Sequence, residues 1–429
     1  MGGHAVGREV NAPATELAGL AAAAAEQAAR TSYGRLLSWL AWQWRDIAAA
    51  EDALAEAFAT ALARWPVDGV PSSPDSWLLT TAKRTLLMQA RREKLAQDPA
   101  LLALFPAEGE GSGEYAPEAA AFPDHRLKLL FICAHPAIDP EIHSALMLQT
   151  VLGLDANRIA SAYLVKPETM TKRLVRAKAK IKATAIRFEE PEPAERPERL
   201  ASVLEAIYGA YTLHWGQLDQ DGANDLAGEA LYLGLLAAQA MPDEAEALGL
   251  ASLLACCEAR RPARLDEAGR FVPLDLQDAR RWDGAMLREA LALLSRAARL
   301  GRPGPYQLEA AIQAAQMHGV IAGSMPWDDI ASLYSRLLTL SPTLGARIGH
   351  AVALGLGSSG APAGLRLLEA MEDESLSTHQ PWWAAKARLA ALAGRHELAA
   401  AAYERTLALT VETAVRDWLQ RQLATLQAG

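Results

Sequence analysis

Apolar residues recur with helical spacing through the first 95 positions of the chain. Apolar residues at i, i+3, i+4 and i+7 share one side of a helix, which can then pack against a neighbour. The pattern predicts helices over Ala14–Arg30, Thr31–Asp46, Glu51–Trp65 and Pro74–Lys94. The last of them begins at Ser73-Pro74-Asp75, a strong start signal. Serine caps a helix, proline suits its first turn, and an acid there meets the positive end of the helix dipole.

A second group of helical patterns follows Pro123. It predicts helices over Arg126–His135, Glu141–Gly153 and Ala156–Leu164, the third capped by Asp155. The buried side of that third helix is expected to hold Ile159, Ala160, Tyr163 and Leu164. A turn at Val165-Lys166 then places Pro167 at the first position of a longer helix that ends near Arg187.

Two stripes run along this longer helix. One is apolar and holds Met170, Leu174, Ala177 and Ile181. The other lies about 90° round the helix and holds Thr169, Arg173, Arg176 and Lys180. A short helix, a tight turn and a longer helix that docks on one face and offers donors on another predict a helix-turn-helix.

Helical patterns also fill the chain beyond Pro197. The segment ASLYSRLLTL at Ala331–Leu340 resembles AAAYERTLAL at Ala400–Leu409, an offset of 69 residues. That offset is about twice the 34-residue period of tetratricopeptide (TPR) repeats. With Gly364–Met371 as a middle copy, the repeat predicts three stacked helical hairpins from about Leu308 to Leu409, with a concave surface.

Composition favours an all-α chain of about two to four domains. Hydrophobic residues make up 51% of the 429 positions and aromatic residues only 6%, which suits packed helices with a sizeable core. Residues 98–123 are rich in Pro, Gly, Ala and Glu, which is typical of a flexible acidic linker. We expect a tail over 1–13, a helical domain over 14–95, a linker over 96–123, a helix-turn-helix domain over 124–190 and a helical extension over 196–429, clearest over 308–410.

Several classes of protein are disfavoured. The chain has no run of about 18 apolar residues, and its N-terminus lacks the charged-then-apolar pattern of a signal peptide. We therefore expect a soluble cytoplasmic protein without a membrane partner. No glycine-rich phosphate loop, H-E-x-x-H or nucleophile motif is found, so we expect no enzyme, no catalytic residue and no cofactor. Three cysteines without C-x-x-C, and a loose group of His125, His135, His143 and Cys133, match no metal site.

The strongest candidate for binding chemistry is the basic segment. Lys166 to Arg187 contains eight Lys or Arg and one acid, inside a chain of net charge −9. Such a concentration predicts a surface for a polyanion, although a merely solvated charged face has the same pattern. In a major groove, Thr169 and Arg173 are placed for base edges and the other cations for phosphate. The candidate DNA contacts here are Lys166, Thr169, Thr171, Lys172, Arg173, Arg176, Lys178 and Lys180.

Two further faces lie on the earlier helices. Trp77 lies among cations and threonines, which suits stacking on an unpaired base, but packing against a neighbouring helix explains it equally well. The candidate contacts to single-stranded DNA are Trp77, Thr80, Lys83, Arg84, Arg91 and Arg92. Asp52 and Glu56, four residues apart, lie opposite an apolar stripe and are either solvated acids or a docking face for a basic helix.

The order of these parts resembles the extracytoplasmic-function (ECF) sigma factors of bacterial RNA polymerase. The likeness is carried by EDALAEAFATALARW at 51–65, DSWLLTTAKRTLLMQARR at 75–92 and ETMTKRLVRAKAKI at 168–181. Three further segments look like signatures of the subgroup with a long C-terminal TPR-containing extension: RLKLLFICAHPAIDPEI, LMLQTVLGLDANRIASAYLV and EARRPARLDEAGRFVPLDLQDARRWD. The resemblance covers about Ala14 to Leu426.

The resemblance implies a sigma region 2 domain, a linker, a sigma region 4 helix-turn-helix domain and a C-terminal α-solenoid. It implies that Asp52 and Glu56 grip the β′ clamp helices of core RNA polymerase, and that the β flap is a second polymerase contact. The helix with Trp77 would open and read the promoter just upstream of the start site, and the basic helix would read a more distant element. Family members commonly carry Asn at the position of Arg84 and Asp at that of Met88, so the promoter bases read here should differ.

The extension carries two open questions. Its loop Arg260–Trp282 holds six arginines and four acids, and is either self-paired or a contact to the sigma domains or polymerase. In the resembled subgroup the extension takes part in control, as an intramolecular or protein regulator. The alternative to a sigma factor is a TPR-containing DNA-binding regulator or adaptor that never engages core polymerase.

Overall fold

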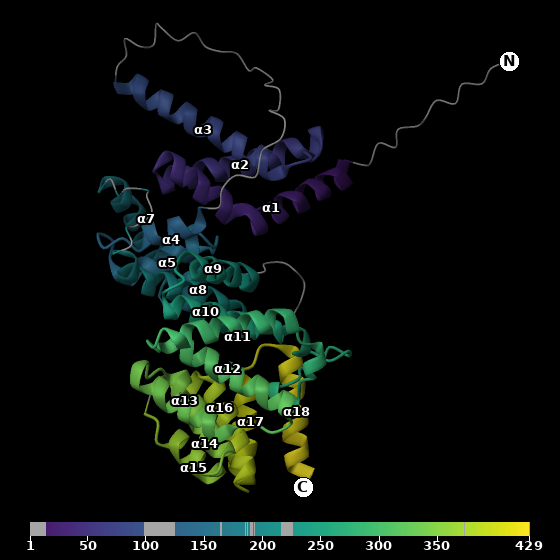
Figure 1. The fold of residues 1–429 in the computed structure, drawn as a ribbon. Helices are drawn as coiled ribbons and strands as arrows, with labels where there is room; N and C mark the ends of the chain where they lie inside the picture. Colours follow the sequence, from purple (N-terminus) through teal and green to yellow (C-terminus); the bar gives the residue numbers. More distant parts are fainter. Residues whose placement is uncertain are drawn as a thin grey trace, which may run out of the picture. The chain divides into compact units, whose positions relative to one another are not determined.

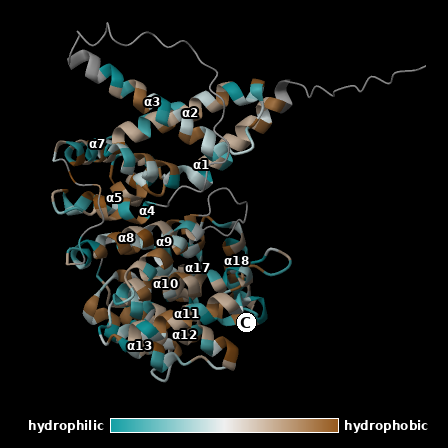
Figure 2. Ribbon diagram, turned by 45° about the horizontal axis from the view of Figure 1, so that its top comes forward, coloured by the Kyte–Doolittle hydropathy of each residue, from teal (hydrophilic) through white to brown (hydrophobic). Residues whose placement is uncertain are grey.

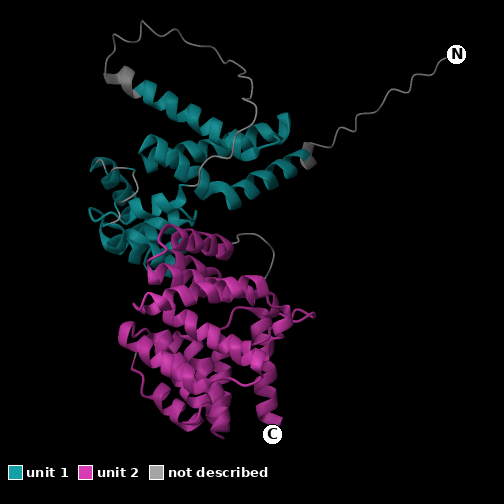
Figure 3. Cartoon of the chain, in the orientation of Figure 1, with its two compact units in different colours: residues 1–206, 222–225 teal, residues 207–221, 226–429 magenta. Residues whose placement is uncertain are grey.

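The computed structural model describes residues 14–97, 125–215 and 226–428, except 164, 185, 187, 189–191, 193 and 373. Over these residues the chain is all-α, as predicted: no strand forms, and one antiparallel bridge joins Leu265 to Phe271. The chain divides into two compact units (Figures 1 and 3), residues 1–206 with 222–225 and residues 207–221 with 226–429. The expected tail, and the expected linker from residue 98 onward, lie outside the described residues.

Unit 1 contains two groups of helices in its described part. The first group is α1 (Ala14–Trp44), α2 (Ile47–Asp68) and α3 (Pro74–Gln97). The second is α4 (Arg126–Cys133), α5 (Pro140–Thr150), α6 (Ala156–Ala162) and α7 (Pro167–Ala183). The start of α8 (Arg196–Trp215) also belongs to unit 1, because the division between the units falls inside that helix.

The first group packs as a three-helix cluster around apolar stripes. The buried side chains include Leu36, Leu40, Leu54, Trp65 and Leu78. The prediction of separate helices over Ala14–Arg30 and Thr31–Asp46 is wrong, because α1 runs through both. The helix continues past Arg30 and Thr31, where the two predicted helices would have met. The Thr31 hydroxyl donates to the Gln27 carbonyl 2.9 Å away, so it bonds within the helix and does not cap a new one.

The second group brings a short helix and a long one together at a turn. Asp155 caps α6 as predicted, its Oδ1 accepting from the amides of Asn157 and Arg158. Pro167 is the first residue of α7, and Lys166 before it makes no side-chain cap. Ile159 and Ala160 are buried as expected, but Tyr163 is 37% exposed and ends the helix as its C-cap, and Leu164 lies outside the described residues.

The two groups of unit 1 touch along α1, α2 and α7. Gly34 of α1 lies so close to Val151, at the end of α5, that a Cβ on it would lie 1.9 Å from the Val151 carbonyl oxygen. A glycine is therefore needed for this close approach. Tyr33 beside it is largely buried and packs against Gly153, and burial raises the pKa of its phenol.

Unit 2 is built of α-helices in its described part. They are the end of α8, α9 (Leu226–Ala240), α10 (Ala245–Ala259), α11 (Gly284–Arg299), α12 (Pro305–Ala322), α13 (Trp327–Leu340), α14 (Leu344–Leu356), α15 (Ala361–Glu369), α16 (Gln380–Leu392), α17 (His396–Leu409) and α18 (Thr413–Ala428). The charge-rich loop between α10 and α11 is the longest described connection of the unit. The helix α10 packs against α9, α11 and α12 and is buried on nearly every side. Figure 2 shows it as predominantly hydrophobic, in contrast to the mostly hydrophilic α7 of unit 1.

Successive helices from α12 to α17 pack against one another. The tetratricopeptide character of these helices stays a prediction. Ala331–Leu340 lies in α13, Gly364–Met371 begins within α15, and Ala400–Leu409 lies in α17. The helices α14 and α15 approach each other closely at Gly364. A Cβ on this residue would lie only 2.3 Å from the Ala351 carbonyl oxygen.

The charge-rich loop Arg260–Trp282 folds into short turns of 3-10 helix, η2 (Arg261–Ala263), η3 (Leu274–Leu276) and η4 (Ala279–Arg281). Two of its acids pair inside the loop: Asp266 with Arg270 at 2.8 Å and Asp278 with Arg280 at 2.8 Å. A third, Asp275, pairs outside it, with Arg388 of α16 at 2.6 Å. The loop is therefore only partly self-paired.

Candidate nucleic-acid interface

The helix α7 presents a cationic stripe beside its packed face, about 90° round the helix. Met170, Leu174, Ala177 and Ile181 are buried as the sequence predicts, each no more than 6% exposed. The exposed candidates on or beside the helix are Lys166, Thr169, Thr171, Lys172, Arg173, Arg176 and Lys180. Because the apolar stripe fixes the rotation of the helix, these donors face solvent as a set.

One candidate on α7 does not belong to that stripe. Lys178 is buried, and its ammonium forms an ion pair with the Glu51 carboxylate of α2. The structure contradicts the prediction that Lys178 contacts phosphate. Its side chain is buried, and its ammonium lies against α2 and not in solvent. Helical spacing alone could not reveal this, since the partner lies 127 positions earlier in the chain.

The contact between α7 and α2 has a second ion pair. Lys182 Nζ lies 2.7 Å from Asp46 Oδ2, and Asp46 also caps α2 by accepting from the Ala49 amide at 3.1 Å. Burial raises the pKa of Glu51, and the nearby Lys178 lowers it. The C-terminal half of α7 is thus held on α2 by two cations, while its outward stripe stays open.

The helix α3 carries a second set of candidate DNA contacts. Thr80, Arg84, Arg91 and Arg92 are exposed, and the Thr80 hydroxyl donates to the Ser76 carbonyl at 2.8 Å. Leu87 and Met88 beside them are 57% and 54% exposed. The face therefore combines cations with apolar side chains, a combination that can hold backbone phosphates and unstacked bases together.

The two remaining candidates on α3 already have intramolecular contacts. Trp77 is half-buried and packs edge-on against Trp65 of α2, with ring centroids 5.5 Å apart. Lys83 is half-buried, and its Nζ lies 4.2 Å from the centroid of the Trp39 ring. Both side chains therefore help to pack α3 against its neighbouring helices. Trp77 can stack on a base only with the part of its ring that stays accessible.

The helix α2 presents an acidic face. Asp52 and Glu56 are both exposed, one turn apart, on the side away from the buried Leu54 and Trp65. Leu62, further along α2, is 52% exposed. An exposed leucine beyond two acids is a contact surface suited to a basic, partly apolar helix.

Sequence reasoning missed three exposed apolar residues of these faces. They are Leu62 on α2, Leu87 on α3 and Val175 on α7, the last 60% exposed. The signal that could have found them is their position: each is apolar, yet falls off the buried stripe of its helix. Val175 lies among the α7 donors, where an aliphatic group can contact a thymine methyl.

The other reactive residue types are structural where they are described. Cys133, Cys256 and Cys257 are buried free thiols, and burial raises the pKa of Cys133 and of Cys256 to about 12. The His143 ring lies 3.1 Å from the Ile138 carbonyl oxygen and 3.2 Å from the Ser202 hydroxyl. No group of three or more metal-ligating side chains is found among the described residues. No described helix is long and apolar enough to cross a membrane.

Comparison with known proteins adds three findings. Residues 29–95 match sigma-70 region 2, and residues 199–298 match a family of unknown function, DUF6596. An uncharacterized protein of Rhizobium meliloti (strain 1021), R00370, is 34% identical over 391 residues, which cover 90% of this chain and 92% of that protein. No solved structure matches the chain. The sigma-70 match covers α2, most of α3 and the second half of α1, where the acidic face and one cationic face lie.

Proposed function

The chain belongs to the same family as R00370 of Rhizobium meliloti, and we propose that it is a sigma factor of the ECF type that directs core RNA polymerase to promoters. The observation that carries the proposal is the match to sigma-70 region 2, which implies a role in transcription initiation with core polymerase and promoter DNA as partners. The exposed side chains of that region suit both partners, since it offers acids on α2 and cations on α3.

The polymerase contact is assigned to α2. Asp52 and Glu56 face solvent in one row and would meet basic side chains of the β′ clamp helices. Leu62 extends the same helix surface with an apolar group, which strengthens a protein contact by burial.

The promoter contacts are assigned to α3 and α7. On α3, Arg84, Arg91 and Arg92 would hold the phosphates of the opened strand near the start site. The helices α6 and α7 would form a helix-turn-helix of sigma region 4, with α7 in the major groove of the upstream element and the β flap as its polymerase partner. Thr169 and Arg173, near the start of α7, are placed to meet base edges.

The proposed role contains no bond-making step of its own. Polymerase forms the RNA, and this chain supplies position: one surface on the enzyme, one on each promoter element. Specific binding of this kind depends on holding both DNA-contacting helices at one spacing, which core enzyme would provide.

Run-off transcription tests the proposal directly. Core polymerase with the 429-residue chain should give promoter-dependent transcripts from templates selected out of a random library. Core enzyme alone should give none. Absence of any such transcript, with DNA binding retained, would leave the alternative of a DNA-binding regulator or adaptor.

A second experiment tests the assigned polymerase surface. The double variant Asp52→Arg and Glu56→Arg should abolish co-purification with β′, because it reverses the charge of the acidic face. The matched control is Asp68→Arg at the far end of the same helix, where an acid is also exposed. Equal loss of β′ in both variants would contradict the assignment.

The extension is proposed to control the sigma segments, with its helix pairs forming a TPR-like solenoid. The test compares promoter binding, with core enzyme present, by the full chain and by residues 1–215. A cut before Arg196 is unsuitable, because it removes Ser202, which belongs to unit 1 and contacts His143. Unchanged binding and transcription would remove the regulatory role.

A further inference from the structure

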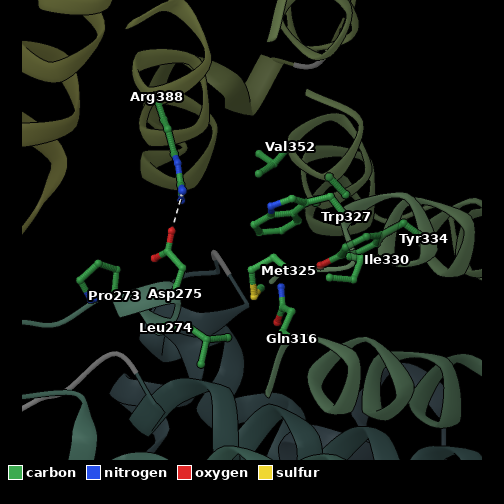
Figure 4. Close-up of a pocket in the computed structure, with 12 residues that line it drawn as sticks. Pro273, Leu274, Asp275, Gln316, Met325, Trp327, Ile330, Tyr334, Val352 and Arg388 are labelled. Atoms are coloured by element: carbon green, nitrogen blue, oxygen red, sulfur yellow. Dashed lines mark hydrogen bonds and ion pairs between the residues drawn. The ribbon is translucent and has the colours of Figure 1, made fainter. Parts of the chain in front are cut away.

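A cavity of about 250 Å³ lies inside unit 2, beneath a segment of the charge-rich loop (Figure 4). The segment contributes Pro273, Leu274 and Asp275. The opposite wall is mostly apolar and comes from α13, α14 and the turn before α13; it includes Met325, Trp327, Ile330, Tyr334 and Val352. Gln316 of α12 adds one amide to the lining. Arg388 of α16 closes the cavity at its polar end.

The segment Phe271–Leu276 is held over this cavity by contacts at both ends. The Phe271 ring packs edge-on against Trp418 of α18, with centroids 6.0 Å apart. Asp275 Oδ2 accepts a charge-assisted hydrogen bond from Arg388 Nη2 at 2.6 Å. A piece of chain thus joins two helices that follow it by more than 100 positions, and one of its apolar side chains, Leu274, lines the cavity.

The ion pair at one end is of an exchangeable kind, while the Val272 amide also donates to the Arg264 carbonyl at 2.8 Å within the loop. The Arg388 and Asp275 side chains are 43% and 25% exposed, and ion pairs so open to water contribute little to stability. Leu276, at the end of the segment, is 70% exposed. Beyond the ion pair, the segment is braced from within the loop, because Gln277 Nε2 donates to the Val272 carbonyl at 3.2 Å.

The cavity has room for a side chain. An apolar cavity of about 150 Å³ in another protein admits benzene, so about 250 Å³ admits a leucine or an aromatic ring. An arginine at one end of an apolar pocket selects an apolar group that stands beside a carboxylate. Leu274-Asp275 has this chemistry, and it already occupies the rim.

We propose that this cavity, with Arg388, is a docking site for a short segment of a partner protein that carries an apolar side chain next to a carboxylate. Leu274-Asp275 lines the rim of the site and pairs with its arginine while the partner is absent. A polypeptide is favoured as the occupant because the structure already seats a stretch of polypeptide there, and because Arg388 supplies the complementary charge. The inference goes beyond the proposed function, and its test involves neither polymerase nor DNA.

The test uses the full chain and a fluorescent synthetic peptide with the sequence of residues 269–277, Gly-Arg-Phe-Val-Pro-Leu-Asp-Leu-Gln. Asp275→Asn, with or without Phe271→Ala, should release the internal segment and raise the affinity for the peptide at least about tenfold over the unmodified chain. Adding Arg388→Gln should remove that gain. The matched control is Asp278→Asn, which removes a loop acid paired with Arg280 and should leave peptide binding unchanged.

A charge-exchange experiment distinguishes loss of peptide recognition from loss of folding. Arg388→Glu combined with Asp275→Asn should reject the acidic peptide and bind a peptide with lysine at the Asp275 position. Recovered binding by the exchanged pair supports direct recognition. Two outcomes overturn the proposal: no peptide binding by any released variant whose helix content matches the unmodified chain, which makes the segment a permanent wall, or binding that ignores residue 388.

Discussion

The ion pair between Lys178 and Glu51 joins α7 to α2 through two side chains that are 8% and 19% exposed. Burying two charges is costly, and their attraction offsets that cost only while both are present. The pair is therefore expected to act as a contact that holds these helices together, more than as a source of net stability. Removing only one of the two charges should lower stability most, because the other charge then stays buried without a partner.

The first prediction follows from that asymmetry. Lys178→Met keeps the length of the side chain but leaves Glu51 buried without its partner. We expect the free energy of unfolding to fall by about 2–3 kcal/mol near pH 8. Urea unfolding followed by circular dichroism measures it, and Lys172→Met, at an exposed position of the same helix, is the matched control.

The same pair predicts a dependence on pH. Burial raises the pKa of Glu51, so the folded chain binds more protons there than the unfolded chain between the ordinary and the raised pKa. Stability from this group therefore falls as pH rises through that window. Lys178 lowers the pKa, so Lys178→Met extends the window upward. The penalty of Lys178→Met should be smallest at low pH, where Glu51 is protonated, and should grow as pH rises.

The control for this pH dependence is the double variant Glu51→Gln and Lys178→Met, in which no carboxyl is left to titrate at residue 51. Between pH 5 and pH 8, the double variant should lose less stability than Lys178→Met alone. A penalty for Lys178→Met that is equal at pH 5 and pH 8 would contradict the buried-pair interpretation.

A separate prediction concerns Gly34. A Cβ there would lie 1.9 Å from a backbone oxygen of Val151, which cannot move aside as a flexible side chain would. Gly34→Ala should therefore destabilise unit 1 by about 1–3 kcal/mol, the usual range for overpacking. Gly19→Ala in the same helix meets nothing within 4 Å and should stabilise it by up to about 1 kcal/mol, because alanine favours helix. Thermal unfolding of the two variants gives the comparison.

A single helix, α7, packs against α2 through one side and exposes cations on another. The ion pairs of Lys178 and Lys182 use one side, and Thr169, Arg173 and Arg176 stay exposed on another. DNA can therefore reach the cationic stripe without breaking the contact to α2. Base contacts and phosphate contacts on that stripe should then separate by experiment.

Arg173 and Lys172 provide that separation. Arg173→Ala should cost about 1–3 kcal/mol at one base pair and relax the preference there, because arginine reads guanine in the major groove. Lys172→Ala should weaken binding to all sequences alike and reduce the slope of log K against log salt by about 0.9. Binding measured with core enzyme on a set of single-base variants distinguishes them, and equal effects of both substitutions on every sequence would refute the assigned roles.

Several features of α6 and α7 could be predicted from the spacing of residues in the sequence. The four buried residues of α7, its first residue Pro167 and the cap of α6 by Asp155 follow from local rules, and the structure confirms them. The burial of Lys178 could not be predicted, because it depends on Glu51, which only the tertiary fold brings near. The prediction divided α1 at Thr31, whose hydroxyl is satisfied inside the continuous helix by the Gln27 carbonyl.

At the scale of the whole molecule, charge is segregated in a chain whose net charge is −9. Acids face out from α2, and cations face out from α3 and α7. The two similar segments Ala331–Leu340 and Ala400–Leu409 both lie in helices, but the contact of Phe271 with Trp418 had no signal in the sequence. An ion pair such as Asp275–Arg388, 113 positions apart, is set by the fold and not by a local pattern.

The segregated charge predicts how the chain binds DNA by itself. Apart from Lys182, which pairs with Asp46, the exposed cations of α7 and its cap are Lys166, Lys172, Arg173, Arg176 and Lys180. Each neutralised phosphate contributes about −0.9 to the slope of log K against log salt, so α7 alone should give a slope no steeper than about −4.5. Fluorescence anisotropy between 50 and 300 mM salt measures the slope.

Binding by the chain alone should be weak and nearly indifferent to sequence. Addition of core enzyme should steepen the slope and introduce a sequence preference as α3 engages the DNA. A slope near −8 without core enzyme would mean that α3 and α7 already bind together, which would remove the need for polymerase to set their spacing.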